Sequence, residues 1–321
     1  MTTLSLQNSR YNQRKVSGPD VSVVLLTYRR PATLEKCLLQ LLKQVTVLTF
    51  EIVVVDNDEF ASGRGIVEKA MEESASAEVR LEYQIVPEQN ISLARNAGIT
   101  KSSGDIVAFI DDDESPSEMW LQLMYDALKR LDADGVFGPV LASFPDGYPD
   151  WLKESRVFSR RRMKTGACLG KTPEACKTGN ALIYKHVLKS RPGPFDAAYG
   201  RTGGEDSELF HWLTQQGRTF YWCDDAVVYE IQGKERMELS WHMSRGYRGG
   251  WAHAKKIRAA HGMTIGGSYL VLSAGFSSLK ILLEALNEYR NPRGAVMFLL
   301  RGWASQAGKI GFLLGWKIEG Y

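Results

Sequence analysis

From residue 21 onward, short runs of β-branched residues alternate with amphipathic segments long enough to be helices. This alternation is typical of a βαβ sheet with helices on both faces, and it predicts an α/β fold. Strands are predicted at 21–27, 50–55, 81–86, 106–110, 181–184 and 226–229, and helices at 31–42, 120–131 and 205–216. A further helix is predicted to follow Ser92, which we take as its N-cap, and to end before Gly104.

The pattern changes beyond Leu239, where helical segments contain glycines and two apolar stretches occur at 265–286 and 295–318. A membrane span needs roughly 20 predominantly apolar residues, and glycines and charges interrupt both stretches. We therefore predict an amphipathic helix lying in the membrane interface, with tryptophans at the headgroups and basic side chains facing lipid phosphate. These residues are Trp303 and Trp316, and Arg301, Lys309 and Lys317. The alternative is a helical lid packed on the preceding domain.

Three regions follow from these patterns: a loose polar tail at 1–18, an α/β domain at 19–238 and a helical C-terminal extension at 239–321. The tail lacks the apolar core of a signal peptide. A content of 44% hydrophobic and 24% charged residues excludes disordered and fibrous classes. The net charge of +3 is too small to indicate a nucleic-acid partner. Four cysteines at unrelated spacings predict neither disulfides nor a zinc site, which favours the reducing cytosol.

Carboxylates follow two of the predicted strands directly. Asp56 ends the second strand, and Asp111, Asp112 and Asp113 follow the fourth. Ligands bind beyond the carboxyl ends of parallel strands, so these side chains are expected to meet at one edge of the sheet. Adjacent carboxylates raise one another's pKa unless a cation neutralises them, which indicates a Mn²⁺ or Mg²⁺ site. The alternative is a solvated turn.

Several motifs occur in a fixed order: VSVVLLTYRRPATLEKCL, EIVVVDN, NISLARNAGI, GDIVAFIDDDESP, KTGNALIY and GGEDSELFHWLTQQG. In this combination the chain resembles the family-two glycosyltransferases of GT-A fold, over about its first three quarters. The stretch from CDDAVVYEIQGKERMELSW to SRGYRGG is similar to bacterial exopolysaccharide transferases of the succinoglycan kind. The resemblance implies a Rossmann-like nucleotide-binding sheet flanked by helices.

The resemblance also implies roles in binding a nucleotide-sugar donor. The loop that receives the nucleoside would be formed by Thr27, Tyr28 and Arg29, and Asp56 would bind the base. A carboxylate can accept an imide N–H, and a tyrosine offers a face for stacking. Arg95 would also belong to the donor site, and Asn180 would lie near the sugar. Asp111 would lie near the ribose and Asp112 beside the diphosphate. Asp113 would be the principal metal ligand, together with Asp111.

The remaining implied roles concern chemistry and the acceptor. Asp206 would be the general base in a single displacement that inverts the anomeric configuration, and Glu205 would orient a sugar hydroxyl. Trp212 either packs under the acceptor or fills core. Arg245 and Arg248 would clamp the donor or a lipid diphosphate, because guanidinium suits phosphate geometry. Glu230 stands where some relatives have a His, and it either contacts the metal or pairs with Arg236.

By resemblance, the chain is expected to move a sugar from a UDP-sugar to a polyprenyl-diphosphate-linked glycan. It would work with Mn²⁺ or Mg²⁺, peripherally on the cytoplasmic face of the cell membrane. Three alternatives stay open: a transferase with a soluble or protein acceptor, a sugar nucleotidyltransferase, and a non-catalytic binding protein. The nucleotidyltransferase is disfavoured because no Gly-rich phosphate loop follows the first strand. Intact Asp113 and Asp206 argue against the binding protein.

Overall fold

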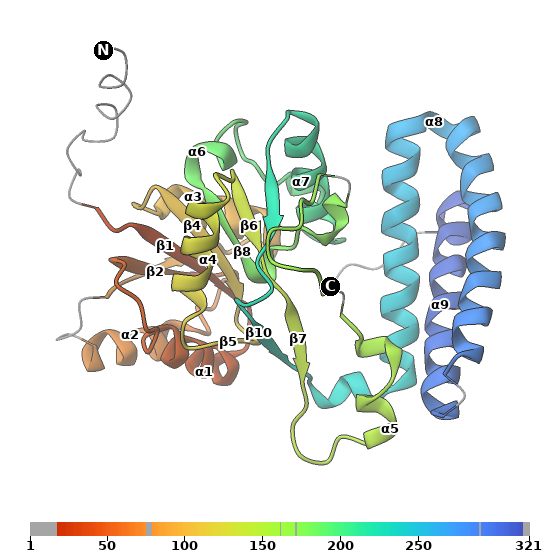
Figure 1. Ribbon diagram of the computed structural model, residues 1–321, viewed down its shortest axis with the longest axis horizontal. Helices are drawn as coiled ribbons and strands as arrows, with labels where there is room; N and C mark the ends of the chain where they lie inside the picture. The colour runs from red at the N-terminus through yellow and green to blue at the C-terminus, as the bar shows by residue number, and fades with distance from the viewer. Residues whose placement is uncertain (1–17, 75–78, 161, 171, 289, 317–321) are drawn as a thin grey trace, which may run out of the picture.

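The computed structural model describes residues 18–74, 79–160, 162–170, 172–288 and 290–316, without the side chains at 259–260 and 263–265. Its main sheet has seven strands in the order β3-β2-β1-β4-β8-β6-β9 (Figure 1). The strands are β1 Val21–Thr27, β2 Phe50–Asp56, β3 Arg80–Ile85, β4 Ile106–Asp111, β6 Gly135–Phe137, β8 Ala181–Tyr184 and β9 Phe220–Trp222.

The first four strands of this sheet pair in parallel, whereas β8 runs antiparallel to both β4 and β6. Every residue of β1 and β2 is buried, as expected for strands that are covered on both faces. The α/β class and the GT-A type of fold are confirmed, with a mixed rather than wholly parallel sheet.

Helices cover both faces of the sheet. One core cluster joins α1 Pro31–Leu41, α2 Arg64–Glu73 and α4 Trp120–Arg130 to the sheet. The other cluster joins α3 Ile91–Lys101, α6 Lys185–Leu188 and α7 Glu205–Gln215 to it. The cap of α3 is Asn90 and not Ser92 as predicted, because the Asn90 Oδ1 accepts from the N–H groups of Ser92 and Leu93.

A second sheet, in the order β5-β10-β7, joins the first at the end of β4. It consists of β5 Glu114–Pro116, β7 Val140–Ser143 and β10 Val228–Ile231. Because β5 begins three residues after β4 ends, Asp112 and Asp113 lie at the junction of the two sheets. Glu230 of β10 pairs in register with Glu114 of β5. The junction therefore gathers acidic side chains from segments far apart in the sequence.

Short helices occupy the connections. They are α5 Asp150–Lys153 and the 3-10 turns η1 Arg156–Phe158, η2 Pro173–Ala175, η3 Thr178–Asn180, η4 Ala197–Tyr199 and η5 Lys234–Met237. The segment between β7 and η2 thus contains α5 and η1.

The C-terminal extension consists of α8 Leu239–Leu286, which bends at Gly262 with φ 72°, and α9 Pro292–Leu313. The two halves of α8 and α9 run side by side next to the α/β domain (Figure 1). Glycines allow this close packing. A Cβ added at Gly250 would lie 1.8 Å from the Ser305 carbonyl oxygen, and one at Gly308 would lie 2.0 Å from that of Tyr247.

The extension is docked on the α/β domain. The Ser155 Oγ donates to the Gly294 carbonyl over 3.3 Å, and the Arg301 Nη1 donates to the Val157 carbonyl over 2.7 Å. Met297 of α9 also packs in a small core cluster with residues of α5 and η1. Arg301 therefore points into the protein and Lys309 is 8% exposed, so the expectation that both face lipid phosphate is wrong. Lys317 lies outside the described residues.

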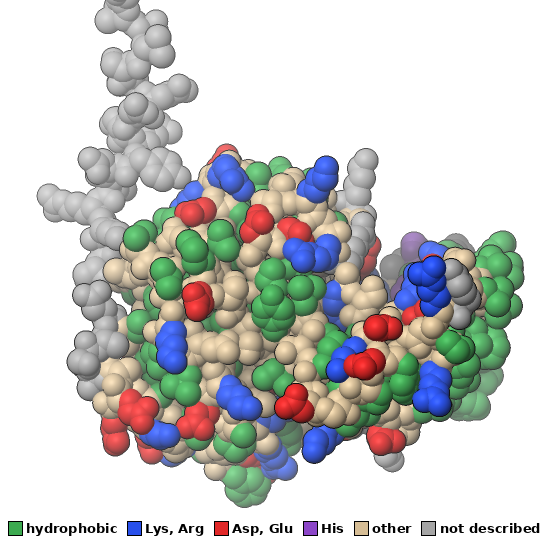
Figure 2. Space-filling model, turned by 60° about the horizontal axis from the view of Figure 1, so that its bottom comes forward, with side chains coloured by type: hydrophobic (Ala, Val, Ile, Leu, Met, Phe, Trp, Pro, Cys, Tyr) green, Lys and Arg blue, Asp and Glu red, His purple; other side chains and the backbone are tan. Residues whose placement is uncertain are grey.

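The second half of α8 presents an apolar surface to solvent. By length and composition, the segment Gly266–Leu286 is able to cross a membrane, and 17% of its most apolar stretch is buried. This result differs from our expectation that glycines and charges interrupt the stretch too often for a membrane span. Exposed side chains recur every three or four residues, at Tyr269, Leu272, Phe276, Leu279, Leu283 and Leu286. We call these six residues the apolar stripe, and hydrophobic side chains gather at this end of the molecule (Figure 2). Trp303 and Trp316 are exposed as well.

Candidate active site

A cleft of about 380 Å³ opens at the carboxyl ends of β1 and β4. This volume is within the usual range for small-molecule sites. Residues from six segments line the cleft: Thr27, Tyr28 and Arg30 from the end of β1; Asn57 after β2; Asn90 before α3; Asp111, Asp112 and Asp113 from the end of β4; Gly203 and Glu205 at the start of α7; and Glu230, Arg236 and Arg245 from β10 to α8. The fold thus brings most of the predicted site residues together.

The loop after β1 directs successive side chains to different places. The Thr27 Oγ1 donates to Asp112 Oδ2 over 2.7 Å, and Tyr28 lines the cleft. Arg29 has a positive φ of 54° and turns outward, where its Nε donates to Asp58 over 3.0 Å. Arg30 takes the inward position, and the sequence interpretation that gave Arg29 a nucleoside contact missed this residue.

Asp56 does not reach the cleft. Its Oδ2 accepts from the Gly63 N–H over 2.7 Å and from the Tyr83 hydroxyl over 2.8 Å, and its Oδ1 accepts from the Asp58 N–H. The carboxylate is fully buried with both oxygens engaged, so the expected contact with a base is wrong for this geometry. Asn57 lines the cleft instead.

The three consecutive aspartates lie close together at the cleft. Burial raises the pKa of Asp111 to about 7 even though Arg95 lowers it, and burial raises the pKa of Asp112 to about 6. The pKa of Asp113 is raised by burial as well. Such a group of carboxylates is stabilised in its charged form by a cation.

Glu114 belongs to the same acidic group, and the sequence interpretation did not include it. Its Oε2 accepts from the Asp111 N–H over 2.8 Å, and burial raises its pKa well above the usual range. A Cβ at Gly179 would lie 2.4 Å from its Oε1. The glycine of the KTGN motif therefore makes room for this glutamate.

A metal at this site would need ligands beyond the protein. In the described parts of the chain, no three His, Cys, Asp or Glu side chains converge in a way that could hold a metal ion. The Asp113 carboxylate does face the cleft, and Mg²⁺ is commonly held by one or two carboxylates completed by substrate phosphates and water. The acidic group therefore fits a metal that arrives together with a diphosphate.

Glu230 pairs with arginines, which decides between the two alternatives left open by the sequence. Its Oε1 accepts from Arg236 Nη1 over 2.7 Å, and its Oε2 accepts from Arg160 and Gln232 over 3.2 and 3.1 Å. Burial opposes ionisation, but Arg236 and Arg160 lower the pKa of Glu230 to about 2. With both oxygens engaged, the side chain is not placed as a metal ligand.

Arg95 links the aspartates to the start of α7. It is 4% exposed, its Nη1 is ion-paired with Glu205, and its Nη2 lies 3.6 Å from Asp111 Oδ1. Glu205 lines the cleft, and its Oε2 is buried without a hydrogen-bond partner.

Asp206 lies next to this lining, at the N-terminus of α7. Gly203 and Gly204 precede the helix with φ of 77° and 98°, a left-handed conformation that glycine tolerates. Lys177 Nζ lies 3.4 Å from both oxygens of Asp206. The sequence interpretation missed Lys177, although it is the first residue of the KTGN motif.

Seven predicted site residues lie outside the cleft lining: Arg29, Asp56, Arg95 and Asp206, described above, and Asn180, Trp212 and Arg248. Asn180 is buried; its Nδ2 donates to the carbonyls of Pro139 and Ala226, and its Oδ1 accepts from Trp120. Its expected position near a sugar is therefore wrong. Trp212 packs against the core and under Arg191, 4.8 Å from the ring centroid, which favours the core-filling alternative. Arg245 lines the cleft, whereas Arg248 on the same helix does not.

Residues 22–189 match the family described as Glycosyl transferase family 2. The chain belongs to this glycosyltransferase family. It is 30% identical over 314 residues to the succinoglycan biosynthesis protein ExoM of Rhizobium meliloti, covering 94% of this chain and 95% of the relative. Glycosyltransferase AglE of Haloferax volcanii is 34% identical over 214 residues, covering 65% of this chain and 66% of the relative. The protein is thus a family-two glycosyltransferase related to an enzyme of exopolysaccharide synthesis.

Solved structures show the same fold. S. aureus TarS 1–349 in complex with UDP-GlcNAc superposes with a TM-score of 0.53 at 18% identity, covering 92% of each chain. TarS 1–349 in complex with UDP gives a TM-score of 0.52 at 17% identity and the same coverage. At these identities the likeness establishes the fold of this family-two enzyme alone.

Proposed function

We propose that this glycosyltransferase moves a sugar, with inversion, from a UDP-sugar to a polyprenyl-diphosphate-linked glycan. The proposal rests on one observation: the cleft brings the aspartates after β4 to the start of α7, where Glu205 and Asp206 lie. The two groups suit the two halves of the reaction, which are release of a diphosphate and deprotonation of an acceptor. The uridine nucleotides bound by TarS support the choice of donor base.

The donor half uses the loop after β1 and the aspartates. Tyr28 offers a face for stacking the base, and Thr27 fixes Asp112 beside the place proposed for the diphosphate. Asp113 would hold a Mn²⁺ or Mg²⁺ ion, which when bound neutralises charge on the departing diphosphate. Glu205 lines the cleft and positions the sugar, and its ion pair with Arg95 holds it in place.

The acceptor half uses Asp206. Its carboxylate takes the proton of the acceptor hydroxyl as that oxygen attacks the anomeric carbon from the face opposite the diphosphate. The carbon–oxygen bond to the diphosphate breaks as the new bond forms, which inverts the configuration. Lys177 contacts the same carboxylate and helps to orient it.

The extension suits an acceptor that is held at a membrane. Arg245 of α8 lines the cleft, and the apolar stripe lies on the second half of the same helix. A lipid-linked acceptor presents its sugar close to the bilayer, so an enzyme docked there meets it at a high effective concentration. We place the enzyme on the cytoplasmic face, where nucleotide sugars are available.

Calorimetry with UDP, GDP and CDP, each with and without Mn²⁺, tests the donor half. We expect binding of UDP that requires Mn²⁺, and weaker or no binding of GDP and CDP. The Asp113→Asn variant should fold and lose the Mn²⁺-dependent part of UDP binding. Equal affinity for UDP in the folded variant would exclude Asp113 as the metal ligand.

A second candidate is transfer to a soluble or protein acceptor, which the docking of α9 on the α/β domain favours. The two candidates differ in their products. Incubation with radiolabelled UDP-sugars and either a membrane lipid extract or a soluble cell fraction should label organic-extractable lipid under our proposal. Label only in soluble glycan or protein would support the second candidate.

A further inference from the structure

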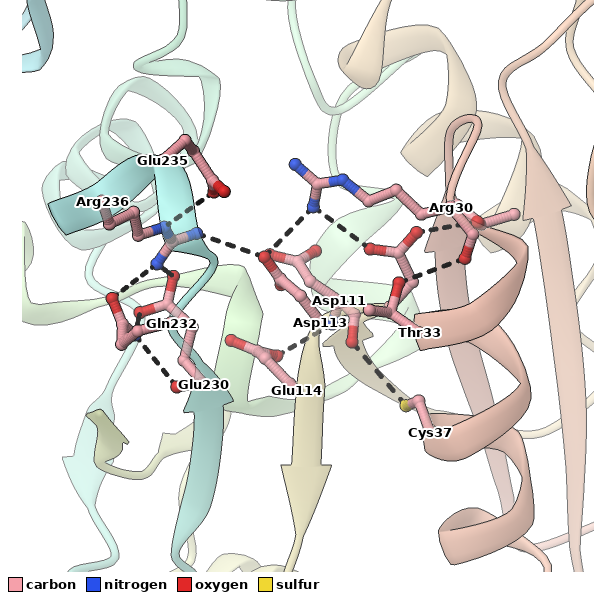
Figure 3. Close-up of polar contacts among 12 residues, drawn as sticks. Arg30, Thr33, Cys37, Asp111, Asp113, Glu114, Glu230, Gln232, Glu235 and Arg236 are labelled. Carbon is pink, nitrogen blue, oxygen red and sulfur yellow. Dashed lines mark hydrogen bonds and ion pairs between the residues drawn. The ribbon is translucent and has the colours of Figure 1, made fainter. Parts of the chain in front are cut away.

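Two guanidinium groups converge on one oxygen of Asp113. Arg30 Nη1 lies 3.1 Å from Asp113 Oδ2, and Arg236 Nη2 lies 3.3 Å from the same atom. Figure 3 shows that the two side chains approach the carboxylate from opposite sides, Arg30 from the start of α1 and Arg236 from η5. The oxygen that faces the cleft is therefore already neutralised by the protein itself.

The two arginines are held very differently. Arg236 has a side chain that is 9% exposed, and its Nη1 donates to Glu230 Oε1 over 2.7 Å and to Gln232 Oε1 over 2.9 Å. Glu230 is fixed in turn by Arg160. Arg30 has a side chain that is 54% exposed, and its further contact is Asp112 at 3.4 Å. Arg236 is thus a buried cation held by several partners, and Arg30 is an exposed one held by the carboxylates of Asp112 and Asp113.

A metal ion and these guanidinium groups compete for the same carboxylate oxygen. A divalent cation that takes Asp113 Oδ2 must displace both Arg30 Nη1 and Arg236 Nη2, because a doubly charged ion repels the two guanidinium groups strongly at contact distance. The exposed Arg30 side chain turns toward solvent, whereas Arg236 keeps its place beside the acidic group. The displaced N–H donors of Arg236 remain in the cleft, since the Glu230 and Gln232 contacts to Nη1 hold the rest of the side chain. A diphosphate oxygen is then the natural acceptor, because guanidinium matches phosphate geometry.

We propose that Arg236 shields Asp113 from metal in the empty enzyme and becomes a ligand of the donor diphosphate when nucleotide and metal enter together. Glu230 is the positioning residue for Arg236, which is why a glutamate stands beside the acidic group without serving as a metal ligand. Metal alone then binds weakly, and a nucleoside diphosphate raises its affinity, because the guanidinium gains a new partner. By linkage, the metal raises the affinity for the diphosphate by the same factor. The inference rests on the proposed donor site.

The test is the affinity for Mn²⁺ measured by electron paramagnetic resonance, with no nucleotide, with UMP and with UDP. In the wild-type enzyme we expect weak binding alone and with UMP, and much tighter binding with UDP. The R236Q variant should bind Mn²⁺ more tightly in the absence of nucleotide. Its affinity for UDP should fall by about 10- to 100-fold, the loss expected for charge-assisted hydrogen bonds, with little change for UMP.

Matched variants separate this role from a general loss of charge. Arg162 pairs with Asp224 at the surface, so R162Q removes one arginine with no effect on either affinity. E230Q should shift both affinities in the same directions as R236Q but less, and it provides the test if R236Q does not fold. Unchanged Mn²⁺ and UDP affinities in folded R236Q, or in E230Q should R236Q fail to fold, overturn the inference. Absence of any UDP binding by the wild type overturns the proposed donor instead.

Discussion

Asp56 and Asp113 are both aspartates near the carboxyl end of a parallel strand, but their oxygens have different partners. Asp56 accepts from Gly63, Tyr83 and Asp58 and is fully buried. Asp113 faces the cleft, and the side-chain partners of its Oδ2 are two arginines. At the scale of the residue, the hydrogen bonds already made decide which motif carboxylates are free to take part in binding.

Asp206→Asn separates chemistry from donor binding. The substitution keeps the shape of the side chain and removes the proton acceptor, so transfer should fall by about 10²- to 10⁴-fold with nearly unchanged affinity for UDP. Initial rates and calorimetry measure the two effects. Glu208→Gln, two residues further along α7 and paired with Arg191, is the matched control and should keep full activity. Full turnover by Asp206→Asn would show that another carboxylate is the general base.

His242 should make stability depend on pH. His242 is fully buried at the start of α8. Its Nε2 donates to the Arg236 carbonyl, and its Nδ1 has no hydrogen-bond partner. Burial lowers its pKa to about 4, below the ordinary value of 6.5. The unfolded chain therefore binds this proton first, and stability present above pH 6.5 is lost as the pH falls toward 4.

Thermal melting at pH 7.5 and pH 5 tests this histidine. The His242→Gln variant should lose less stability between the two pH values than the wild type, by about 1–2 kcal/mol, because it has no proton to gain. An equal loss in both proteins would show that other groups account for the acid sensitivity.

At the scale of the element, glycine has opposite effects at neighbouring positions of α8. A Cβ at Gly250 would lie 1.8 Å from the Ser305 carbonyl oxygen of α9, whereas a Cβ at Gly249 would contact nothing within 4 Å. The buried glycine is required by the close approach of the two helices. The exposed one only weakens the helix, because glycine loses more backbone freedom on folding than alanine.

Gly250→Ala should therefore lower the free energy of unfolding by about 1–3 kcal/mol, the usual penalty of overpacking. Gly249→Ala, one position away, should raise it by about 0.5–1 kcal/mol. Denaturant titration measures both. Equal effects of the two substitutions would contradict the packing of α8 against α9.

At the scale of the whole molecule, the extension has two sides with different chemistry. Its inner side is tied to the α/β domain through Arg301 and packs closely through glycines. Its outer side carries the apolar stripe, in which Phe276 is 78% exposed. Large exposed apolar surfaces mark sites of interaction, and this one suits the hydrophobic interior of a bilayer.

Phe276→Asp and Leu272→Asp should each weaken flotation with anionic vesicles, because a charge replaces an apolar side chain at the bilayer surface. The inward position of Arg301 and Lys309 removes them from the lipid contact, so added salt should weaken flotation only slightly. Val47→Asp, at a position 91% exposed on the α/β domain, is the control. A wild-type protein that stays wholly in solution beside anionic vesicles at low salt would exclude the membrane proposal.

The amino-acid sequence alone determined five of the seven strands of the main sheet and the position of the acidic residues. The two strands that were not predicted, β6 and β9, have three residues each. Buried strands follow from local apolar runs. The strands at 21–27 and 181–184 were predicted with the bounds that the structure shows. The placement of Asp111 to Asp113 at a strand end is likewise local. Helix α2 was missed, because only Val67 and Ala70 of its ten residues are buried.

Only the tertiary structure decided which side chains are free to act. Asp56 and Asn180 are engaged by partners distant in sequence, Gly179 makes room for Glu114, and Arg30 takes the inward place expected for Arg29. The pairing of Glu230 with Arg236 and the burial of Lys309 also depend on contacts that only the folded chain makes. Periodicity reports the face of a helix or strand, whereas hydrogen bonds and close packing depend on which segments meet, and folding alone brings those segments together.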